Sequence, residues 1–302
     1  MGVPNVKVLV TGSSGQLGSY LCELLMKEHD VRGLDIAPQP LAPLRKASMK
    51  GDICDVGDAR KALRGVDAVV HCAAQVSVVK SQEDPVSDAT TNVLGTVNML
   101  YLSQVAGVSK FVYVSSAAVF GNPKYIPVDE KHPTEPMNNY GASKLAGEKF
   151  ALAFAKTSSM VAVSVRPFNF YSPRADPQSP YSGVITKFVT RLKAGRAPII
   201  EGDGKQTRDF IHARDVAEMI ALVLEKKVAS GDVFNCGTGC STSVLELADT
   251  AIKVSGRKVK PEFTAPRIGD IRDSVADNKK AASQLGFRPR TSLKDGLAEM
   301  FT

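Results

Sequence analysis

Cysteine is scarce in this sequence, and the few cysteines present form no disulfide framework. They are odd in number and stand far apart, at Cys22, Cys54, Cys72, Cys236 and Cys240. Such a set excludes a disulfide-stapled secreted scaffold and predicts reduced thiols in a cytoplasmic protein. Cys236 and Cys240 could supply two metal ligands, but no second pair of cysteines or histidines lies nearby. We therefore expect no metal site.

Long apolar runs and basic clusters are also missing. No apolar run approaches the ~20 residues that a membrane-spanning helix needs, and the N-terminal residues predict a short strand and a turn instead of a signal peptide. We expect no membrane partner and no nucleic-acid partner, since the cations are dispersed and no aromatic residues interleave with them. Residues 1–150 carry 15 basic and 15 acidic side chains, so the net charge of +7 lies wholly in residues 151–302. This imbalance favours a phosphorylated small molecule as the partner.

What the sequence does contain is an alternation of strands and helices. Buried strands are predicted at 6–10, 31–35, 67–74, 111–116 and 161–167, with an amphipathic helix at 16–28. This alternation predicts right-handed crossovers and a doubly wound parallel sheet, an α/β fold of the Rossmann type. After residue 168 the pattern breaks at a loop rich in Pro, Ser and aromatics. We expect one domain at 1–168, with parts of 209–236 packed back onto it, and a smaller C-terminal α/β domain at 169–302.

The first strand leads into a glycine-rich turn, TGSSGQLG at 11–18. Gly12, Gly15 and Gly18 allow a tight turn, a close approach of the backbone to a pyrophosphate, and packing of the next helix on the strand. The helix N-terminus offers amide donors and the positive end of its dipole. Asp35 ends the second strand, where a carboxylate hydrogen-bonds the adenosine ribose and repels a 2′-phosphate. The predicted cofactor is therefore NAD and not NADP, with Asp52, Ala73 and Ala74 placed to line its adenine and ribose.

Tyr140 and Lys144 are four residues apart in NNYGASKLAGE, residues 138–148. On a helix these two side chains share one face, and an ammonium group beside a phenol lowers the pKa of the phenol. The pair is then a candidate general base near neutral pH. Taken alone, the spacing is explained more simply by a solvated polar face at the start of a helix.

A series of motifs runs along nearly the whole chain. In order they are TGSSGQLG, GDICD, HCAA, NVLGT (92–96), SSAAVFG (115–121), YGASK, RPFNFYSP (166–173), GDGKQTRDFIHARDVA (202–217), FNCGTG (234–239) and GDIRDSVAD (269–277). Together they resemble the extended short-chain dehydrogenase/reductase family, and within it the NAD-dependent nucleotide-sugar epimerases. The resemblance implies an NAD-binding domain, a nucleotide-sugar-binding domain, and inversion of carbon 4 of a UDP-hexose through a transient 4-keto sugar. UDP-glucose and UDP-galactose are the substrates implied, with the N-acetylhexosamines as further candidates.

The resemblance also implies roles for particular residues. Tyr140 would remove a hydroxyl proton, Lys144 would bind the nicotinamide ribose, and Ser116 would hydrogen-bond the developing oxyanion. Besides Tyr140 and Lys144, the cofactor-binding residues implied are Gly12, Gly15, Gln16, Leu17, Asp35, Ile36, Asp52, Ile53, Ala73, Ala74, Gln75, Asn92, Ser115 and Phe168. The substrate-binding residues implied are Ser116 at the sugar, Asn169, Arg208 and Arg267 at the diphosphate, Val184 near the base, Asp270 near the uridine ribose and Ser274. A bulky residue at the position of Ser274 would close the pocket around the substituent on carbon 2, and a serine would leave it open.

Other functions stay open at this point. A dehydratase or decarboxylase on the same scaffold needs acid/base groups just after the catalytic serine, where this chain has Ala117 and Ala118. An epimerase or reductase of UDP-glucuronate or of a dTDP-sugar would differ only in its contacts to sugar or base. An NAD-sensing binding protein without chemistry usually lacks the tyrosine or the lysine, and this chain has both. A homodimer is expected from the resemblance alone.

Overall fold

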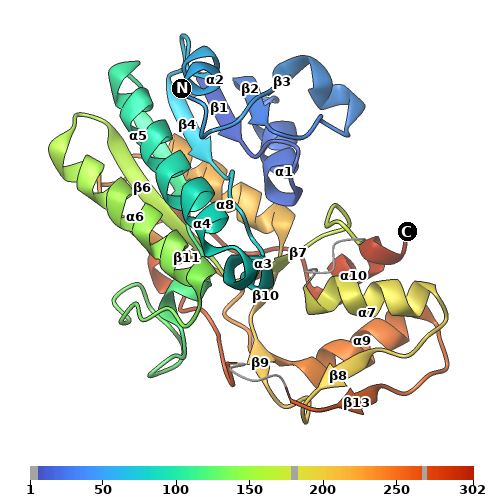
Figure 1. Cartoon of the computed structure of the whole chain (residues 1–302). Coiled ribbons are helices and arrows are strands. Elements are labelled where there is room, and N and C mark those ends of the chain that lie inside the picture. Colours follow the sequence, from blue (N-terminus) through green and yellow to red (C-terminus); the bar gives the residue numbers. More distant parts are fainter. Residues whose placement is uncertain (1–5, 178–182, 267–270) are drawn as a thin grey trace.

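The computed structural model describes residues 6–177, 183–266 and 271–302, and its centre is a parallel sheet of seven strands (Figure 1). The strand order is β11-β6-β5-β4-β1-β2-β3, so the chain starts near the middle and winds outward in both directions. The strands are β1 (Lys7–Thr11), β2 (Asp30–Asp35), β3 (Ser48–Lys50), β4 (Ala68–His71), β5 (Lys110–Val114), β6 (Val161–Pro167) and β11 (Val233–Cys236). The predicted doubly wound α/β fold is confirmed. The short strands β3 and β11 are absent from the prediction.

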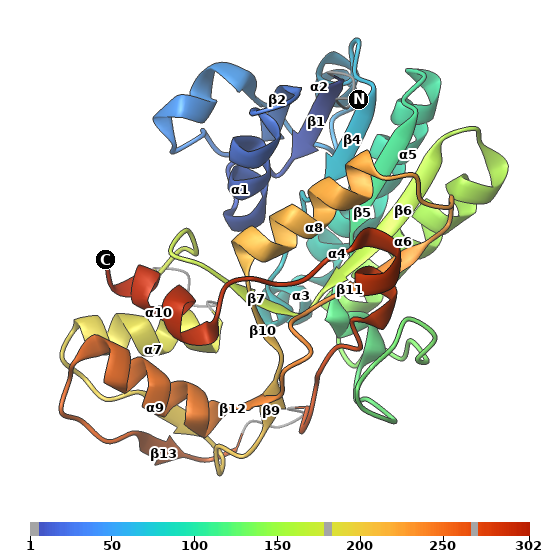
Figure 2. The same cartoon turned by 180° about the vertical axis from the view of Figure 1, so that it is seen from behind.

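Helices cover both faces of this sheet. α1 (Gln16–Leu25) and α8 (Ala213–Glu225) pack together on one face (Figure 2), while α2 (Val56–Ala62), α5 (Thr96–Val105) and α6 (Asn139–Thr157) cover the other (Figure 1). Neighbouring residues of one strand, such as Leu9 and Val10, belong to two different buried cores. Continuous apolar strands predict this for a sheet that is buried on both sides. Shorter helical segments link these elements: η1 (Ala42–Ala47), α3 (Val78–Glu83), α4 (Pro85–Ala89), η2 (Thr90–Gly95) and η3 (Ala117–Phe120).

A smaller group of elements lies apart from the large sheet in both views (Figures 1 and 2). β7 (Asn169–Tyr171) pairs in parallel with β10 (Phe210–His212), β8 (Ile199–Glu201) pairs in parallel with β13 (Glu262–Thr264), and β9 (Thr207–Arg208) runs antiparallel to β12 (Thr242–Ser243). The helices are α7 (Val184–Lys193), α9 (Val244–Ser255) and α10 (Leu293–Phe301), which enclose a third core around Phe188 and Leu247. The π-helical turn η4 (Ala281–Leu285) returns to the large sheet, because Ala281 and Leu285 are buried in its first core.

Helix α6 places the tyrosine–lysine pair. The side chain of Asn138 caps the helix by accepting a hydrogen bond from the Gly141 amide at 2.8 Å. Because this cap starts the helix at Asn139, Tyr140 lies in the first turn and Lys144 lies one turn further along the same face. A Cβ on Gly141 would come within 2.6 Å of the Ala118 carbonyl oxygen. The glycine therefore lets α6 lie directly against η3.

Three local predictions differ from the structure. The first helix ends at Leu25 and not at residue 28, since residues 26–28 form a turn, and β4 ends at His71 and not at residue 74. The predicted loop after residue 168 contains β7, whose hydrogen-bonding partner β10 lies about 40 residues further along the chain. A short strand with a distant partner has no local signal. Within the described ranges, no helix is long and apolar enough to cross a bilayer, and no cluster of three or more His, Cys, Asp or Glu residues could hold a metal ion.

Candidate active site

The glycine-rich turn brings the loops after β1 and β4 together. Gly12 adopts a φ of +68°, and a Cβ there would lie 2.8 Å from the Ala73 amide nitrogen. A Cβ on Gly18 would lie only 2.0 Å from the Gly12 carbonyl oxygen. Both positions therefore require glycine. The backbone at this point forms a cradle at the carboxyl ends of β1 and β4, which is the usual place for a ligand in a doubly wound sheet.

The N-terminus of α1 fits a pyrophosphate. Its N-cap residue, Gly15, provides no side-chain hydrogen bond to the helix, so the amides of the first turn stay available to an anion. The Gln16 amide nitrogen Nε2 is buried and has no hydrogen-bond partner in the protein. The Leu17 side chain is buried in the core, so this residue can contact a cofactor only through its backbone. The unpartnered Gln16 donor and the uncapped first turn of the helix are what a diphosphate group needs.

The predicted adenosine end of the site lies at the ends of β2 and β3. The Asp35 carboxylate accepts hydrogen bonds from the Ser14 and Ala37 amides, both at 2.9 Å. Beside it, Ile36 is 67% exposed, which is unusual for isoleucine and suits a ring packed on it. A cavity of about 370 Å³ opens here between Ile36, Lys50, Gly51, Asp52 and Asp58. The Ile53 side chain is instead buried against Gly95, so it does not line this cavity.

Replacing Asp35 by alanine should narrow the preference for NAD over NADP. The carboxylate repels a 2′-phosphate, and its loss also removes a ribose hydrogen bond worth about 0.5–3 kcal/mol. Affinity for NAD should therefore fall while affinity for NADP rises. Calorimetric titration with both dinucleotides measures this, with thermal melting as the check on folding, since Asp35 also ties the turn at Ser14. A wild-type protein that binds both dinucleotides equally would contradict the role of Asp35.

Ser116, Tyr140 and Lys144 come together where β5, η3 and α6 meet. Ser116 caps η3 by accepting a hydrogen bond from the Ala118 amide at 3.1 Å, and its hydroxyl lies close enough to the Tyr140 phenol to lower the pKa of that phenol. Lys144 is 3% exposed and donates from Nζ to the Val114 carbonyl at 2.6 Å. Its ammonium also lies 4.5 Å from the centre of the Tyr113 ring. The three predicted catalytic side chains thus form one cluster in the structure.

The electrostatics of this cluster differ from the prediction. Burial raises the pKa of Tyr140 above its ordinary value, and the negative charge of Asp88 raises it further, while the hydrogen bond from Ser116 lowers it. The protein alone thus holds a protonated phenol, and the predicted lowering of this pKa by Lys144 is wrong for the protein without its cofactor. Burial lowers the pKa of Lys144 to about 8. At neutral pH the lysine is therefore still mostly a cation.

The other predicted cofactor residues fall into two groups. Ala73, Ala74 and Gln75 are half-buried and follow β4, whereas Ser115 and Phe168 are buried at the ends of β5 and β6. The Phe168 ring lies in a closed cluster with Val119, Phe120, Val128 and Ala276, so its side chain does not face the site. The Asn92 amide is also buried and is fully engaged by protein partners. Asn92 therefore holds the loop after β4 in place.

Three of the predicted substrate residues lie on the smaller group of elements. Asn169 is exposed at the start of β7, Val184 begins α7, and Arg208 is half-buried in β9 with Nη1 donating to the Thr207 carbonyl at 2.7 Å. Ser274 is half-buried. Arg267 and Asp270 lie outside the described residues.

Sequence reasoning missed Asp209, whose buried carboxylate accepts hydrogen bonds from Thr238, Gly239 and Ala276 and so ties the FNCGTG and GDIRDSVAD motifs together. Asp209 stands in the motif TRDF, but from the sequence alone its carboxylate is explained by a local ion pair with the neighbouring Arg208.

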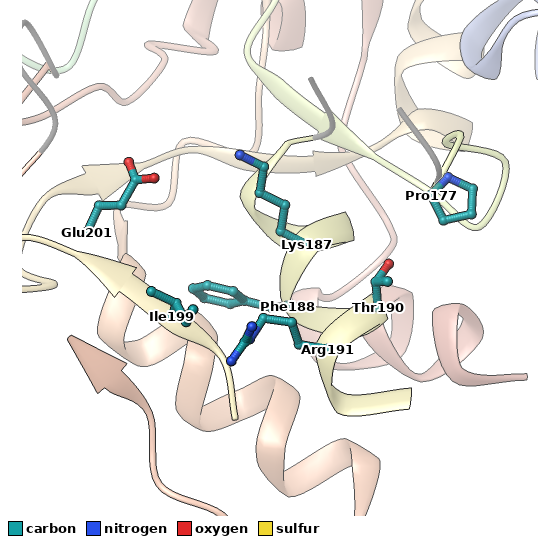
Figure 3. A pocket seen from close by; sticks show the side chains of 7 residues that line it. All are labelled: Pro177, Lys187, Phe188, Thr190, Arg191, Ile199 and Glu201. Carbon is teal, nitrogen blue, oxygen red and sulfur yellow. The ribbon is translucent and has the colours of Figure 1, made fainter. Parts of the chain in front are cut away.

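A second cavity, of about 320 Å³, lies between α7 and β8 (Figure 3). Phe188 and Ile199 form its apolar part, while the charged ends of Lys187, Arg191 and Glu201 lie around it. Arg191 is tied down, because Nε donates to the Ala197 carbonyl and Nη2 lies 3.4 Å from Glu262. The sequence carried no signal for this cavity beyond the position of Val184 on the same helix.

Known proteins share both the fold and these motifs. The sequence model of the NAD dependent epimerase/dehydratase family matches residues 8–237. A UDP-glucose 4-epimerase of Mycolicibacterium smegmatis is 37% identical over 310 residues, which cover 97% of each chain. The crystal structure of UDP-glucose 4-epimerase from Thermotoga maritima with UDP-glucose superposes with a TM-score of 0.92 at 32% identity, over 98% of this chain and 97% of that one. A UDP-N-acetylglucosamine 4-epimerase from Methanobrevibacter ruminantium, in complex with UDP-N-acetylmuramic acid, gives 0.93 at 28% identity, over 100% and 98%. The predicted resemblance is confirmed: the chain belongs to the NAD-dependent epimerase/dehydratase family of extended short-chain dehydrogenase/reductases, and its cofactor is NAD.

Proposed function

We propose that this protein inverts carbon 4 of a UDP-hexose through a transient 4-keto sugar. The observation that carries the proposal is the cluster of Ser116, Tyr140 and Lys144, in which Ser116 lowers the pKa of the Tyr140 phenol and is followed directly in η3 by Ala117 and Ala118. A dehydratase needs further proton-transferring groups there, and alanine has none. In this proposal, residues 1–168 with α8 and β11 form the NAD-binding domain, and the rest of residues 169–302 bind the nucleotide sugar.

The side chains at this point are suited to moving one proton and stabilising one oxyanion. The glycine-rich turn, Asp35 and Lys144 would hold NAD, whose nicotinamide ring would supply the acceptor and donor of hydride at the sugar carbon. Tyr140 takes the proton from the sugar hydroxyl, and the Ser116 hydroxyl hydrogen-bonds the same oxygen as its charge develops. The Val114 carbonyl and the Tyr113 ring keep the Lys144 ammonium fixed beneath the phenol. The positively charged nicotinamide of bound NAD would lie close to Tyr140, and its charge would lower the pKa of the phenol and so offset the effect of burial.

The nucleotide would extend from this cluster onto the smaller group of elements. We place its base in the cavity of Figure 3, since the apolar part formed by Phe188 and Ile199 can pack against a ring and the surrounding charges can meet its polar edge. The diphosphate would lie between that cavity and the sugar, near Asn169 and Arg208. A guanidinium group suits phosphate oxygens because its planar donors reach two of them at once.

A panel of nucleotide sugars tests the proposed function. Purified protein is incubated separately with UDP-glucose, UDP-galactose, UDP-N-acetylglucosamine, UDP-glucuronate and a dTDP-hexose, and NMR identifies the products. Interconversion of UDP-glucose and UDP-galactose without added reductant is the expected result. A 4-keto-6-deoxy product would show a dehydratase, and no turnover of any nucleotide sugar would favour a protein that only senses NAD.

Ser274→Tyr should suppress turnover of UDP-N-acetylglucosamine and spare UDP-glucose. The Asp273 carboxylate accepts a hydrogen bond from the Thr207 hydroxyl at 2.7 Å, and the Val275 carbonyl accepts one from the Val128 amide at 2.8 Å. These bonds hold the segment on both sides of Ser274, so its backbone should stay in place when the side chain is enlarged. Its clash falls on the substituent at carbon 2 alone. Steady-state rates with both sugars measure the effect, with Ser274→Ala as the control. No wild-type activity on the N-acetyl sugar beside good activity on UDP-glucose would refute the open pocket.

We also propose a cytoplasmic homodimer. Four large apolar side chains are exposed on neighbouring helical segments: Leu94 and Phe150, and Tyr101 and Val105. The last two lie on α5 and Phe150 lies on α6, and these helices run beside each other over one face of the sheet (Figure 1). A second copy of the same face would cover them. Free thiols at all five cysteines are in keeping with a reducing compartment. Sedimentation equilibrium tests the assembly, and a monomer at micromolar concentration would contradict it.

A further inference from the structure

Asp88, in the short helix α4, is a buried carboxylate beside the catalytic cluster. It is 1% exposed. Its oxygen Oδ1 accepts two hydrogen bonds, from Gln75 Nε2 at 2.7 Å and from Asn92 Nδ2 at 3.1 Å. A carboxylate without a cationic partner is rarely buried, because its desolvation is costly. The hydrogen bonds from the Gln75 and Asn92 side-chain amides therefore offset part of the cost of burying the Asp88 carboxylate.

The bonds made by Asp88 continue to Tyr140. Asn92 Oδ1 accepts from the Gln75 amide at 2.8 Å, and Asn92 Nδ2 also donates to Ser143 Oγ at 3.0 Å. Ser143 Oγ in turn donates to the Tyr140 carbonyl at 3.0 Å, while the Tyr140 amide donates to Ser81 Oγ at 3.0 Å. The backbone of Tyr140 is thus held on both sides. One of these two supports leads back through Asn92 to Asp88.

The helix geometry fits this role. Asp88 and Asn92 are four residues apart, and Asn92 lies in the π-helical turn η2 between α4 and α5. Such turns are rare and frequently mark functional sites. Because a carboxylate can only accept hydrogen bonds, Asp88 favours the orientation in which both amides turn their NH₂ groups toward it. The Gln75 backbone carbonyl, which accepts from Asn92 Nδ2 at 2.9 Å, favours the same orientation of Asn92. Asn92 Oδ1 is then directed at the Gln75 backbone, in the loop that follows β4.

We propose that Asp88 is a positioning residue for the proton transfer at Tyr140, acting through Asn92 and Ser143 and through its own negative charge. This inference rests on the proposed function only in assigning Tyr140 the proton transfer. The pKa of Tyr140 supports it, since the charge of Asp88 adds to the raising effect of burial. Asp88 acts on Tyr140 directly, and the other charged and titratable groups here are its neighbours Tyr113 and Lys144 and the groups coupled to these two, which are Glu148 on α6, His71 at the end of β4 and Cys72 after β4. Among these, Asp88 is the one that combines a direct charge effect with a hydrogen-bonded path to the Tyr140 backbone.

The test uses two variants of Asp88, one that removes only its charge and one that removes the whole carboxylate group. Asp88→Asn keeps the size of the side chain and removes the charge, whereas Asp88→Ala removes both hydrogen bonds. Asp215→Asn is the matched control, because Asp215 is also 1% exposed and accepts two hydrogen bonds, from the Arg290 and Thr291 amides, but lies on α8. Ultraviolet titration of the phenols is performed on each protein and on the same protein carrying Tyr140→Phe. Subtracting the titration curve of the Tyr140→Phe protein from that of its parent gives the titration of Tyr140 alone.

Asp88→Asn should lower the pKa of Tyr140 in this titration and move the acid limb of the kcat/KM profile to lower pH, and Asp215→Asn should do neither. Asp88→Ala should reduce kcat by roughly 10–100-fold, with a smaller change in KM for the nucleotide sugar, because the misplaced group acts in the chemical step. If Asp88→Ala does not fold, the titration of Asp88→Asn still decides. An unchanged Tyr140 titration in Asp88→Asn would overturn the proposal. A shifted titration in a protein that turns over no nucleotide sugar would uphold Asp88 and refute the proposed function.

Discussion

The Tyr140→Phe variant is expected to fold and to bind NAD, yet to turn over its nucleotide sugar about 10²–10⁴-fold more slowly, the usual contribution of a positioned acid or base. The substitution removes a single hydroxyl, whose protein partner is Ser116. Lys144 keeps its hydrogen bond to the Val114 carbonyl and its contact with the Tyr113 ring. NAD binding should therefore change little. The loss should appear in kcat, measured under saturating nucleotide sugar.

A second tyrosine provides the control for this variant. The Tyr125 hydroxyl donates to the Asp129 carboxylate at 2.9 Å on the surface, away from the cluster. Tyr125→Phe also removes one hydrogen-bonded hydroxyl, and it should leave kcat close to that of the wild type. A Tyr140→Phe enzyme that turned over at near wild-type rate would show that another group removes the proton.

Local sequence patterns were enough to predict most of the fold and of the cofactor site. The apolar strands, the glycines of residues 11–18 and the acid at the end of β2 each have a signal within a few residues, because their roles depend on the backbone beside them. The same holds for the spacing of Tyr140 and Lys144, which follows from the helix itself. Such features need no knowledge of what packs against them.

Buried polar groups could not be predicted in the same way. Asp88 stands in a polar stretch, DPVSDATTN, where an acid reads as a solvated residue near a helix start. Its partner Gln75 comes from a different loop. The pKa of Tyr140 was predicted in the wrong direction for the same reason, since the burial that raises it is set by the elements packed around α6. Desolvation depends on the assembled fold, and periodicity in the sequence does not report it.

Arg166 and Glu148 form a buried ion pair, which is the clearest example of buried polar groups that the sequence does not predict. Nothing in the local patterns VAVSVRP of β6 and AGEKF of α6 indicates that these two side chains meet, yet in the structure they are 4% and 0% exposed. Arg166 donates from Nε to Glu148 Oε2 at 2.9 Å and from Nη2 to Oε1 at 2.6 Å. Burial alone would raise the pKa of Glu148, but the hydrogen bonds and charge of Arg166 outweigh burial and hold it below its usual range. A depressed carboxylate pKa stabilises the fold above the unfolded pKa, and this stabilisation is lost as the pH falls through the folded value.

Arg166→Met should lower the free energy of unfolding at neutral pH by about 3–5 kcal/mol, because it leaves the Glu148 carboxylate buried without a partner. In this variant burial is no longer offset, so the pKa of Glu148 should rise above its usual value, and protonation should then relieve the cost as the pH falls. The stability gap between wild type and variant is therefore expected to be widest at neutral pH and to narrow in acid. Urea unfolding followed by circular dichroism at both pH values measures this gap. The double variant Arg166→Met/Glu148→Leu should recover most of the loss, since replacing both charges by apolar groups leaves no buried charge unpaired. A gap that stayed constant with pH would show that Glu148 is not the source of the destabilisation.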